Sequence, residues 1–315
     1  MLAEWKLNLL KCNQCGKNKL EISGEKIKCK NCDNFYLVSE SGILSISNFK
    51  RNEVTKFYDN IKGAILFERA NVKFTRSYFE TKVYKSYLEK YVQKSKDIII
   101  LDFGCGDGRF VDWFLKNDYK KIIALDSSKA CLERLKERLS KEQLKNVFLV
   151  HSDMLSNPLK QDSFDFILAI EALYYLNEEF SLGLKKCYDL LRKDGFLLNS
   201  EQNKEGALFI NTIFMDIPTL SMIYKDSVLE EDYKGKKTVA VKLRNYIDVK
   251  RDLEKCGFKI VEREGMSVLP VFISYAYNSK EKHIDNETEK ILTEIVFKTS
   301  AQNKISRCVI HYSRK

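Results

Sequence analysis

The stretch from Ile98 to Phe110, IIILDFGCGDGRF, is the feature that most constrains the fold. An apolar run that breaks into three alternating glycines is typical of a buried strand that leads through a tight turn into a helix. Turns of this kind hold nucleotide cofactors. The stretch therefore predicts an α/β fold with a cofactor at this turn.

The spacing and the charge of this turn argue against a dinucleotide. Its glycines, Gly104, Gly106 and Gly108, follow a G-x-G-x-G pattern rather than the G-x-G-x-x-G fingerprint. Asp102 precedes the first glycine and Asp107 lies within the turn, so a pyrophosphate would meet negative charge there. S-adenosylmethionine (SAM) has no phosphate, and it carries a sulfonium cation and a zwitterionic methionine end. The charge of the turn therefore favours SAM.

The sequence after the turn continues the alternation of strands and helices. The next strand ends at Asp126, 24 residues after Asp102, and is followed by a helix with a leucine face. A carboxylate at the tip of this strand is well placed to accept hydrogen bonds from both hydroxyls of a ribose. A third strand precedes a turn that carries Asp153, a fourth runs over 164–170, and a fifth begins within LLRKDGFLLNSEQ.

Four motifs in this region stand in the order and at the spacing of a known family: LDFGCGDG, ALDSS, HSDMLSNPLKQDSFDFI and LLRKDGFLL. With them, the residues from about 55 to 200 resemble the class I SAM-dependent methyltransferases, near the group that includes the ubiquinone and menaquinone methyltransferases. The resemblance implies a Rossmann-like, seven-stranded doubly wound sheet and SAM as the cofactor.

The resemblance also implies roles for single residues in holding SAM. Asp102 and the three glycines of the turn would hold the methionine end. Asp126 would bind the ribose, and Asp153 with Met154 would bind the edge of the adenine. The alternative for Asp102 and Asp153 is that each only shapes its own turn.

The end of the fourth strand supplies the candidate catalytic residues. By the resemblance, Ile170 and Glu171 would face the reacting methyl group. Relatives of the quinone type often carry a histidine shortly after this point, where EALYYL places Tyr175. A tyrosine has a pKa near ~10 and is a poorer general base at neutral pH than a histidine. Glu171 and Tyr175 remain the catalytic candidates, because methyl transfer depends chiefly on holding the nucleophile in line with the methyl group.

Two C-x-x-C knuckles lie near the start of the chain, in CNQCGKNKLEISGEKIKCKNC, with 13 residues between them. Each knuckle can wrap one side of a tetrahedral ion, so the four thiolates predict a closed zinc site with a structural role. The predicted ligands are Cys12, Cys15, Cys29 and Cys32. The knuckles and the FYLVSESGILSI stretch after them resemble the zinc-ribbon segment that precedes some methyltransferase domains.

These patterns divide the chain into a zinc ribbon over 1–48, a helical extension over 49–96 and a methyltransferase domain over 97–315. The last part is expected to end in a sixth strand and an antiparallel seventh strand beside it. Aromatic-rich insertions at about 202–247 and 268–300 follow strand ends, so they are expected to cap the substrate.

The helical extension is expected to close the site from the other side. The segment 57–82 predicts helices there, with Tyr58 as a candidate wall of the site.

Composition limits the class of protein further. The chain has 315 residues and no apolar run near the roughly 20 residues of a membrane span. Its start lacks the features of a signal peptide, and nine cysteines without such a signal indicate reduced thiols and a cytoplasmic protein. The net charge is +10, but the lysines are spread along the whole chain, which favours a solvated surface over a nucleic-acid patch.

We therefore expect an enzyme that transfers a methyl group from SAM to O, N or C of a small molecule or biosynthetic intermediate. The alternative is an RNA base methyltransferase, because bacterial rRNA guanine methyltransferases also carry a zinc ribbon ahead of this domain. Their ribbons use a histidine as the fourth ligand, whereas this chain has Cys32. A third hypothesis is a protein with the SAM-binding fold but no enzymatic activity, whose ribbon binds a partner. The sequence alone does not define the acceptor atom or the oligomeric state.

Overall fold

The computed structural model describes residues 3–40, 42–46, 53–60, 70–95, 97–233, 236–278, 285–300 and 306–315. In these residues the strands are β1 (Leu20–Ser23), β2 (Lys26–Cys29), β3 (Phe35–Val38), β4 (Leu44–Ser45), β5 (Ile99–Phe103), β6 (Lys121–Asp126), β7 (Val147–His151), β8 (Phe164–Ile170), β9 (Leu191–Gln202), β10 (Val228–Tyr233), β11 (Lys236–Lys242), β12 (Lys259–Met266) and β13 (Cys308–Arg314). The helices are α1 (Glu4–Asn8), α2 (Glu53–Asn60), α4 (Arg76–Tyr91), α5 (Val111–Lys116), α6 (Lys129–Arg138), α7 (Lys141–Asn146), η1 (Leu173–Glu179), α8 (Phe180–Leu190), α9 (Lys204–Ile213), α10 (Ile217–Asp226), α11 (Tyr246–Lys255), α12 (Leu269–Asn278) and α13 (Asn286–Ser300).

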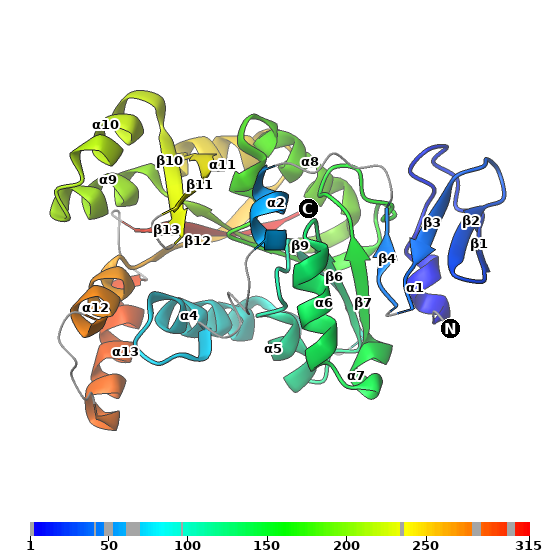
Figure 1. Cartoon of the computed structure of the whole chain (residues 1–315), viewed down its shortest axis with the longest axis horizontal. Helices are drawn as coiled ribbons and strands as arrows, with labels where there is room; N and C mark the ends of the chain where they lie inside the picture. The colour runs from blue at the N-terminus through cyan, green and yellow to red at the C-terminus, as the bar shows by residue number, and fades with distance from the viewer. Residues whose placement is uncertain are drawn as a thin grey trace.

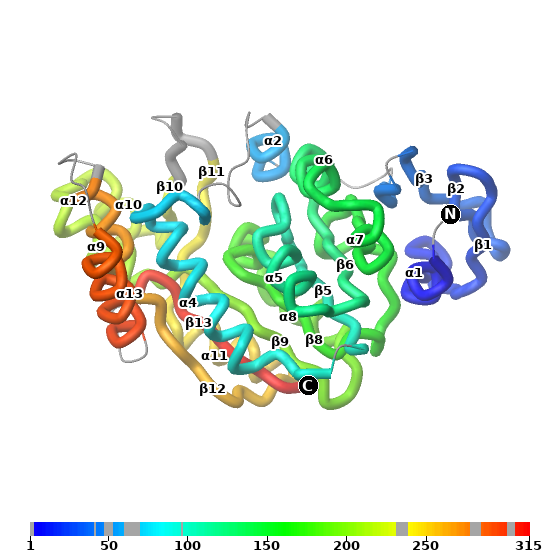
Figure 2. The backbone as a smooth tube through the Cα atoms, turned by 90° about the horizontal axis from the view of Figure 1, so that it is seen from below, coloured from blue at the N-terminus to red at the C-terminus, as the bar shows by residue number. Residues whose placement is uncertain are grey.

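One large sheet runs through the molecule in the order β1-β2-β3-β4-β7-β6-β5-β8-β9-β13-β12 (Figures 1 and 2). The strands from β7 to β9 are parallel, whereas β13 is antiparallel to both of its neighbours. The part from β7 to β12 is the predicted doubly wound sheet, so the predicted fold class is confirmed. The strand order reverses between β5 and β8, and sheets of this kind bind ligands at that point.

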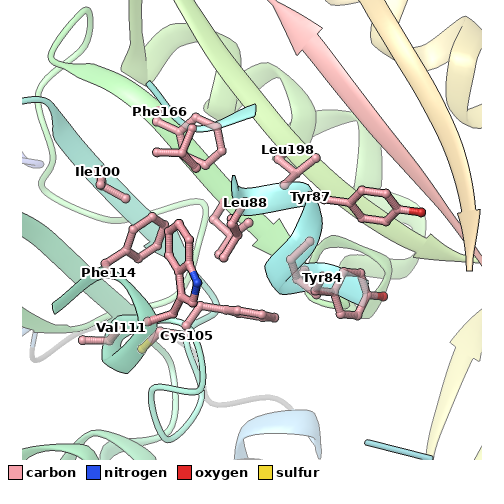
Figure 3. Packing of buried hydrophobic residues seen from close by; sticks show 14 of the residues in the cluster. Tyr84, Tyr87, Leu88, Ile100, Cys105, Val111, Phe114, Phe166 and Leu198 are labelled. Atoms are coloured by element: carbon pink, nitrogen blue, oxygen red, sulfur yellow. The ribbon is translucent and has the colours of Figure 1, made fainter. Parts of the chain in front are cut away.

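The two faces of the sheet are covered by different helices. Ile100 of β5 packs with Leu88 of α4 and Phe114 of α5, as Figure 3 shows. Its neighbour Leu101 points to the opposite face, into a second buried cluster with Leu253 of α11. Because adjacent strand residues alternate between two covered faces, the strand reads as a continuous apolar run in the sequence.

The four-cysteine segment is joined to the edge of this sheet. Its strands β1 to β4 form an antiparallel meander, and β4 pairs in parallel with β7. Helix α1 is attached by the buried side chain of Lys6, whose Nζ donates hydrogen bonds to Leu144 O at 2.8 Å and Val147 O at 2.6 Å. The meander therefore extends the sheet beyond β7 (Figure 1).

The two predicted insertions lie in different places. The first forms α9, α10 and the β10–β11 hairpin, and its Val239 and Val241 pack with Tyr174 of η1 and Phe57 of α2. The second forms α12 and α13, which pack against α4. The second insertion was expected to cap the substrate. Its described contacts are instead with α4 and the core beside it.

Among the described residues, no helix combines the length and the apolar composition that a bilayer span requires.

Candidate cofactor and acceptor site

The glycine turn follows β5, at the carboxyl end of the sheet. All three glycines have positive φ, with values of +85° at Gly104, +54° at Gly106 and +85° at Gly108. A Cβ added at Gly104 would lie 2.6 Å from Ala172 Cβ and 2.7 Å from Met154 Cε. The turn therefore needs glycine at Gly104 for two reasons, its backbone conformation and the close approach of neighbouring side chains.

Asp126 connects the end of β6 to this turn. Its Oδ2 accepts a hydrogen bond from the Gly106 N–H at 2.7 Å, and its Oδ1 accepts one from the Ser128 N–H at 2.8 Å. Burial raises the pKa of Asp126, and these two hydrogen bonds act in the opposite direction. Each carboxylate oxygen has a second lone pair, so the group can still accept hydrogen bonds from a ligand.

Asp102 lies at the end of β5 with 2% of its surface exposed. Its Oδ2 has no hydrogen-bond partner among the described residues. Burial raises the pKa of Asp102 to about 7, against the opposing effect of the Arg109 charge. A buried carboxylate oxygen without a partner is costly, and a cationic ligand group would supply the missing partner.

Asp153 caps its own turn after β7. Its Oδ1 accepts hydrogen bonds from the N–H groups of Leu155 at 2.7 Å and Ser156 at 2.9 Å, and its Oδ2 accepts one from the Ser156 hydroxyl. The neighbouring Met154 reaches toward the glycine turn, as the distance from its Cε to the Gly104 position indicates. The structure thus brings Met154 to the glycine turn, whereas the hydrogen bonds of the Asp153 side chain are made within its own turn.

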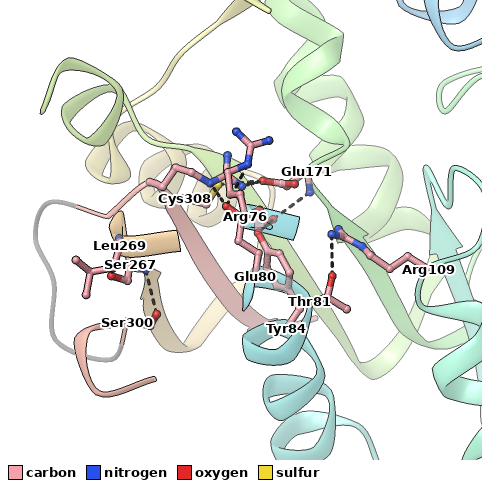
Figure 4. A network of polar contacts seen from close by, with 12 residues as sticks. Arg76, Glu80, Thr81, Tyr84, Arg109, Glu171, Ser267, Leu269, Ser300 and Cys308 are labelled. Atoms are coloured by element: carbon pink, nitrogen blue, oxygen red, sulfur yellow. Dashed lines mark hydrogen bonds and ion pairs between the residues drawn. The ribbon is translucent and has the colours of Figure 1, made fainter. Parts of the chain in front are cut away.

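Glu171, directly after Ile170 at the end of β8, lies in a buried network of charges (Figure 4). Its Oε1 is ion-paired with Arg307, and the Cys308 thiol lies 3.3 Å from the same oxygen. Arg307 Nε also lies 2.5 Å from Glu80 Oε1 of α4. Burial alone would raise the pKa of Glu171, but the charges of Arg307 and its neighbouring arginines lower it to about 2. Glu171 is therefore an anion at neutral pH and a weak proton acceptor.

Tyr175 lies on η1, and its hydroxyl is 2.9 Å from the hydroxyl of Tyr58 on α2. The two rings meet edge to face, with centroids 6.0 Å apart. The structure therefore brings together two tyrosines that the sequence proposed separately, one as a wall and one as a catalytic candidate.

The four predicted metal ligands converge in the meander. Their Sγ atoms all lie within 4.8 Å of one another, and the Cys12–Cys32 and Cys15–Cys29 sulfur distances are both 3.6 Å. Four sulfurs that bind one tetrahedral zinc at 2.3 Å would lie about 3.8 Å apart. The arrangement therefore suits a tetrahedral metal ion.

Sequence reasoning did not single out Glu80, Arg109 or Arg307, although all three are buried beside the site. The sequence did hold an indication for Glu80. It lies four positions before Tyr84 and so on the same face of α4, and Tyr84 also belongs to the network. The sequence held no such indication for Arg307, since its partner Glu171 is 136 residues away in the chain.

Comparison with known proteins places this region in a family. A family model described as "Methyltransferase domain" matches residues 100–195. An uncharacterised protein of Methanocaldococcus jannaschii is 26% identical over 185 residues, which are 59% of this chain and 65% of that protein. The match thus spans less than two thirds of that relative. A demethylmenaquinone methyltransferase of Staphylococcus aureus is 23% identical over 218 residues, covering 65% of this chain and 81% of that protein.

A solved structure shares the fold. The SAM-dependent methyltransferase of Mesorhizobium loti superposes with a TM-score of 0.54 at 16% identity, covering 75% of this chain and all of that one. The site residues fit SAM, because Asp102 offers a buried acceptor without a partner among the described residues, and the turn leaves no room for a Cβ at Gly104 or Gly108. Residues 100–195 therefore match the methyltransferase domain family, and the chain has the fold of the class I SAM-dependent methyltransferases.

Proposed function

We propose that this chain transfers a methyl group from SAM to a small acceptor molecule. Two carboxylates carry the proposal. Asp102, on β5 before the glycine turn, has a buried Oδ2 without a partner among the described residues, and Asp126, on the neighbouring strand, is hydrogen-bonded to the turn. Together they offer acceptors for an ammonium group and for ribose hydroxyls, at the point of the sheet where ligands bind.

The residues of the cofactor site take separate parts. Asp102 receives the amino group of the methionine end, beside the turn formed by the three glycines. Asp126 accepts the ribose hydroxyls, and Met154 with Asp153 borders the adenine. SAM, when bound, supplies an electrophilic methyl group on a sulfonium. The task left to the protein is to hold the acceptor atom in line with that methyl group.

Ile170 and Glu171 border the acceptor. The Oε2 of Glu171 makes no hydrogen bond to a described residue, and the side chain is 16% exposed. Because Glu171 is held as an anion by Arg307, we assign it the role of orienting a hydrogen-bond donor of the acceptor, rather than of removing its proton. Tyr175 and Tyr58 form the opposite wall.

The packing of the first insertion supports a small acceptor. Val239 and Val241 of β11 join Tyr174 and the α2 residues Val54 and Phe57 in one apolar cluster. This cluster lies beside the Tyr58–Tyr175 contact, since Phe57 and Tyr174 are the chain neighbours of those tyrosines. Such a cover restricts access, which suits a small molecule better than a folded RNA.

The four cysteines hold a structural zinc ion in this proposal. Support comes from the sulfur distances and from the number of ligands, because four thiolates leave no position open for a substrate. Few side chains are buried within the meander, so the metal would contribute much of its folding free energy.

An RNA acceptor is the second candidate, and one feature of the meander favours it. Phe35 of β3 is 39% exposed, and Lys26 Nζ lies 4.6 Å from the centre of its ring. An exposed aromatic ring beside a lysine suits the stacking of an unpaired base.

The test supplies methyl-labelled SAM to the purified protein with cell extract divided into small-molecule, protein and RNA fractions. We expect label in the small-molecule fraction, in the wild type and in the control variant Asp226→Ala, which changes an exposed carboxylate of α10. Label in RNA would select the second candidate. Failure of the protein to bind SAM in calorimetry would reject both methyltransferase candidates and favour a protein of this fold without enzymatic activity.

A further inference from the structure

The loop of residues 151–160, which carries Asp153 and Met154, is attached at both ends to the four-cysteine segment. At its start, β4 pairs with β7 through Leu44 opposite Val150 and Ser45 opposite His151. The Ile46 N–H then donates a hydrogen bond to His151 O at 3.1 Å. The entry to the loop is therefore held by β4, the second strand after the last cysteine of the segment.

The exit from the loop is held by the residues that precede the first cysteine. The Lys11 N–H donates to Pro158 O at 2.7 Å, and the Lys160 N–H donates to Leu9 O at 2.9 Å. Between these two bonds, Leu10 and Leu159 form a bridge and are both buried. These are backbone bonds in a water-excluded place, so they define the position of the exit closely.

A third contact reaches the middle of the loop from the first knuckle. Asn13 Nδ2 donates to Ser156 O at 3.3 Å. Asn13 is in turn held by Asn34, whose Nδ2 lies 3.0 Å from Asn13 Oδ1 and 3.5 Å from Cys12 Sγ. Because the Ser156 N–H caps Asp153, a chain of hydrogen bonds runs from a metal-ligand sulfur to that carboxylate.

The cysteines connect these attachments. Lys11 precedes Cys12 directly, and β4 follows Cys32, whose sulfur lies 3.6 Å from that of Cys12. A metal bound by both would close the intervening chain into a loop and hold the two attachments at a fixed separation. Without it, the chain between them would regain conformational freedom.

We propose, resting on the SAM site proposed above, that the four-cysteine segment positions the 151–160 loop for the cofactor, so that metal binding tightens SAM binding. Asn13 and Asn34 act as positioning residues in this coupling. The cofactor site and the metal site are then parts of one structural unit, although the 151–160 loop is more than a hundred positions from the cysteines in the sequence.

The experiment compares zinc-loaded wild type with metal-free protein, prepared both by a chelator and as Cys29→Ser. Two quantities are measured: the Kd of SAM by calorimetry, and the hydrogen exchange of backbone amides without SAM. We expect the Kd to rise roughly 5- to 150-fold on metal loss, the usual range of coupling between distinct sites. The amides of Leu155, Ser156 and Lys160 should exchange faster, while that of Ile167 in β8 should not change.

A second variant keeps all four cysteines. Asn13→Asp loses the donor to Ser156 O and keeps an acceptor for Asn34, so its Kd should rise about two- to fivefold with full metal content, the worth of one exposed hydrogen bond. The matched control is Asn117→Asp, which loses a similar bond to Trp113 O of α5 and should bind SAM like the wild type.

The outcomes separate the two proposals. Equal exchange of the loop amides with and without metal would overturn the coupling. Faster exchange with an unchanged Kd would overturn its effect on the cofactor. If zinc-loaded wild type binds no SAM, the proposed function fails, and the exchange data still decide whether the metal positions the loop.

Discussion

The N–H of Gly106 donates a hydrogen bond to Asp126 Oδ2 at 2.7 Å, so the glycine turn after β5 and the tip of β6 are fixed against each other. The carboxylate is held on its other oxygen by the Ser128 N–H at 2.8 Å. Its orientation is therefore set before any ligand arrives. Such preorganisation spares the cost of ordering the group on binding.

Asp126→Ala is expected to raise the Kd of SAM at least roughly 100-fold, because two hydrogen bonds to a charged acceptor, at about 1.5–3 kcal/mol each, are lost. Calorimetry measures the Kd, and circular dichroism checks that the fold is retained. Asp226→Ala, at an exposed position, serves as the control. Wild-type affinity in Asp126→Ala would show that the cofactor lies elsewhere.

Gly104→Ala is expected to destabilise the protein by more than about 2 kcal/mol and to weaken SAM binding. The backbone strain at positive φ costs about 1–2 kcal/mol, and the added Cβ would also lie 2.6 Å from Ala172 Cβ. Gly24→Ala is the matched control, since its φ is +60° and nothing lies within 4 Å of its added Cβ. Urea unfolding of both variants measures the difference, and equal losses would show that the approach of Ala172 is not tight.

The raised pKa of Asp102 predicts a pH dependence of stability. Between pH 4 and pH 7 the folded protein retains a proton on Asp102 that the unfolded chain has lost, because the folded pKa is about 7 against an ordinary 3.8. The contribution of this group to the free energy of unfolding therefore falls as pH rises through this window and is constant above it.

Asp102→Asn should remove this dependence. Relative to the wild type, the variant should gain about 2–3 kcal/mol in free energy of unfolding between pH 5 and pH 8, since the window spans about two pKa units. Urea unfolding at the two pH values measures the gain. A stability difference that stays constant with pH would mean that Asp102 ionises normally.

Much of this fold and part of this site follow from local sequence patterns. The strand and glycine turn, the carboxylate Asp126 and the cysteine knuckles are each defined by a short spacing, and the structure brings each set together. Local patterns record such features because the chemistry needs those residues close in the chain.

The remaining features depend on contacts between distant residues. The pairing of β4 with β7 could not be read from the sequence, because a two-residue strand carries no periodicity. The ion pairs that hold Glu171 join α4, the residue after β8 and the residue before β13, so no single segment contains the signal. The resemblance to the family predicted that Asp153 binds the edge of the adenine. In the structure its carboxylate accepts hydrogen bonds within its own turn.

Cys29→Ser is expected to lose the bound metal, because three thiolates and a neutral hydroxyl bind zinc far more weakly than four thiolates. Elemental analysis of the purified protein measures the metal content. Cys256→Ser, outside the cluster and half-buried, should keep one metal ion per chain. A full complement of metal in Cys29→Ser would reject the four-cysteine site.

Arg307→Met tests the buried network directly. Arg307 is the shared partner of Glu80 and Glu171, so its loss leaves two buried carboxylates without their main counter-charge. We expect a loss of about 3–5 kcal/mol in the free energy of unfolding, the usual effect of breaking a buried pair. Arg314→Met, at the end of β13, removes an exposed pair with Asp194 and should cost less than about 1 kcal/mol.

A second substitution separates lost charge pairing from lost packing. In the double variant Glu80→Gln, Arg307→Met, one of the uncompensated charges is gone, so part of the stability should return. Chemical unfolding of the four proteins of this cycle gives the coupling between the two positions. If the double variant is less stable than Arg307→Met by the full effect of Glu80→Gln alone, the two side chains act independently and the network does not stabilise the acceptor side of the site.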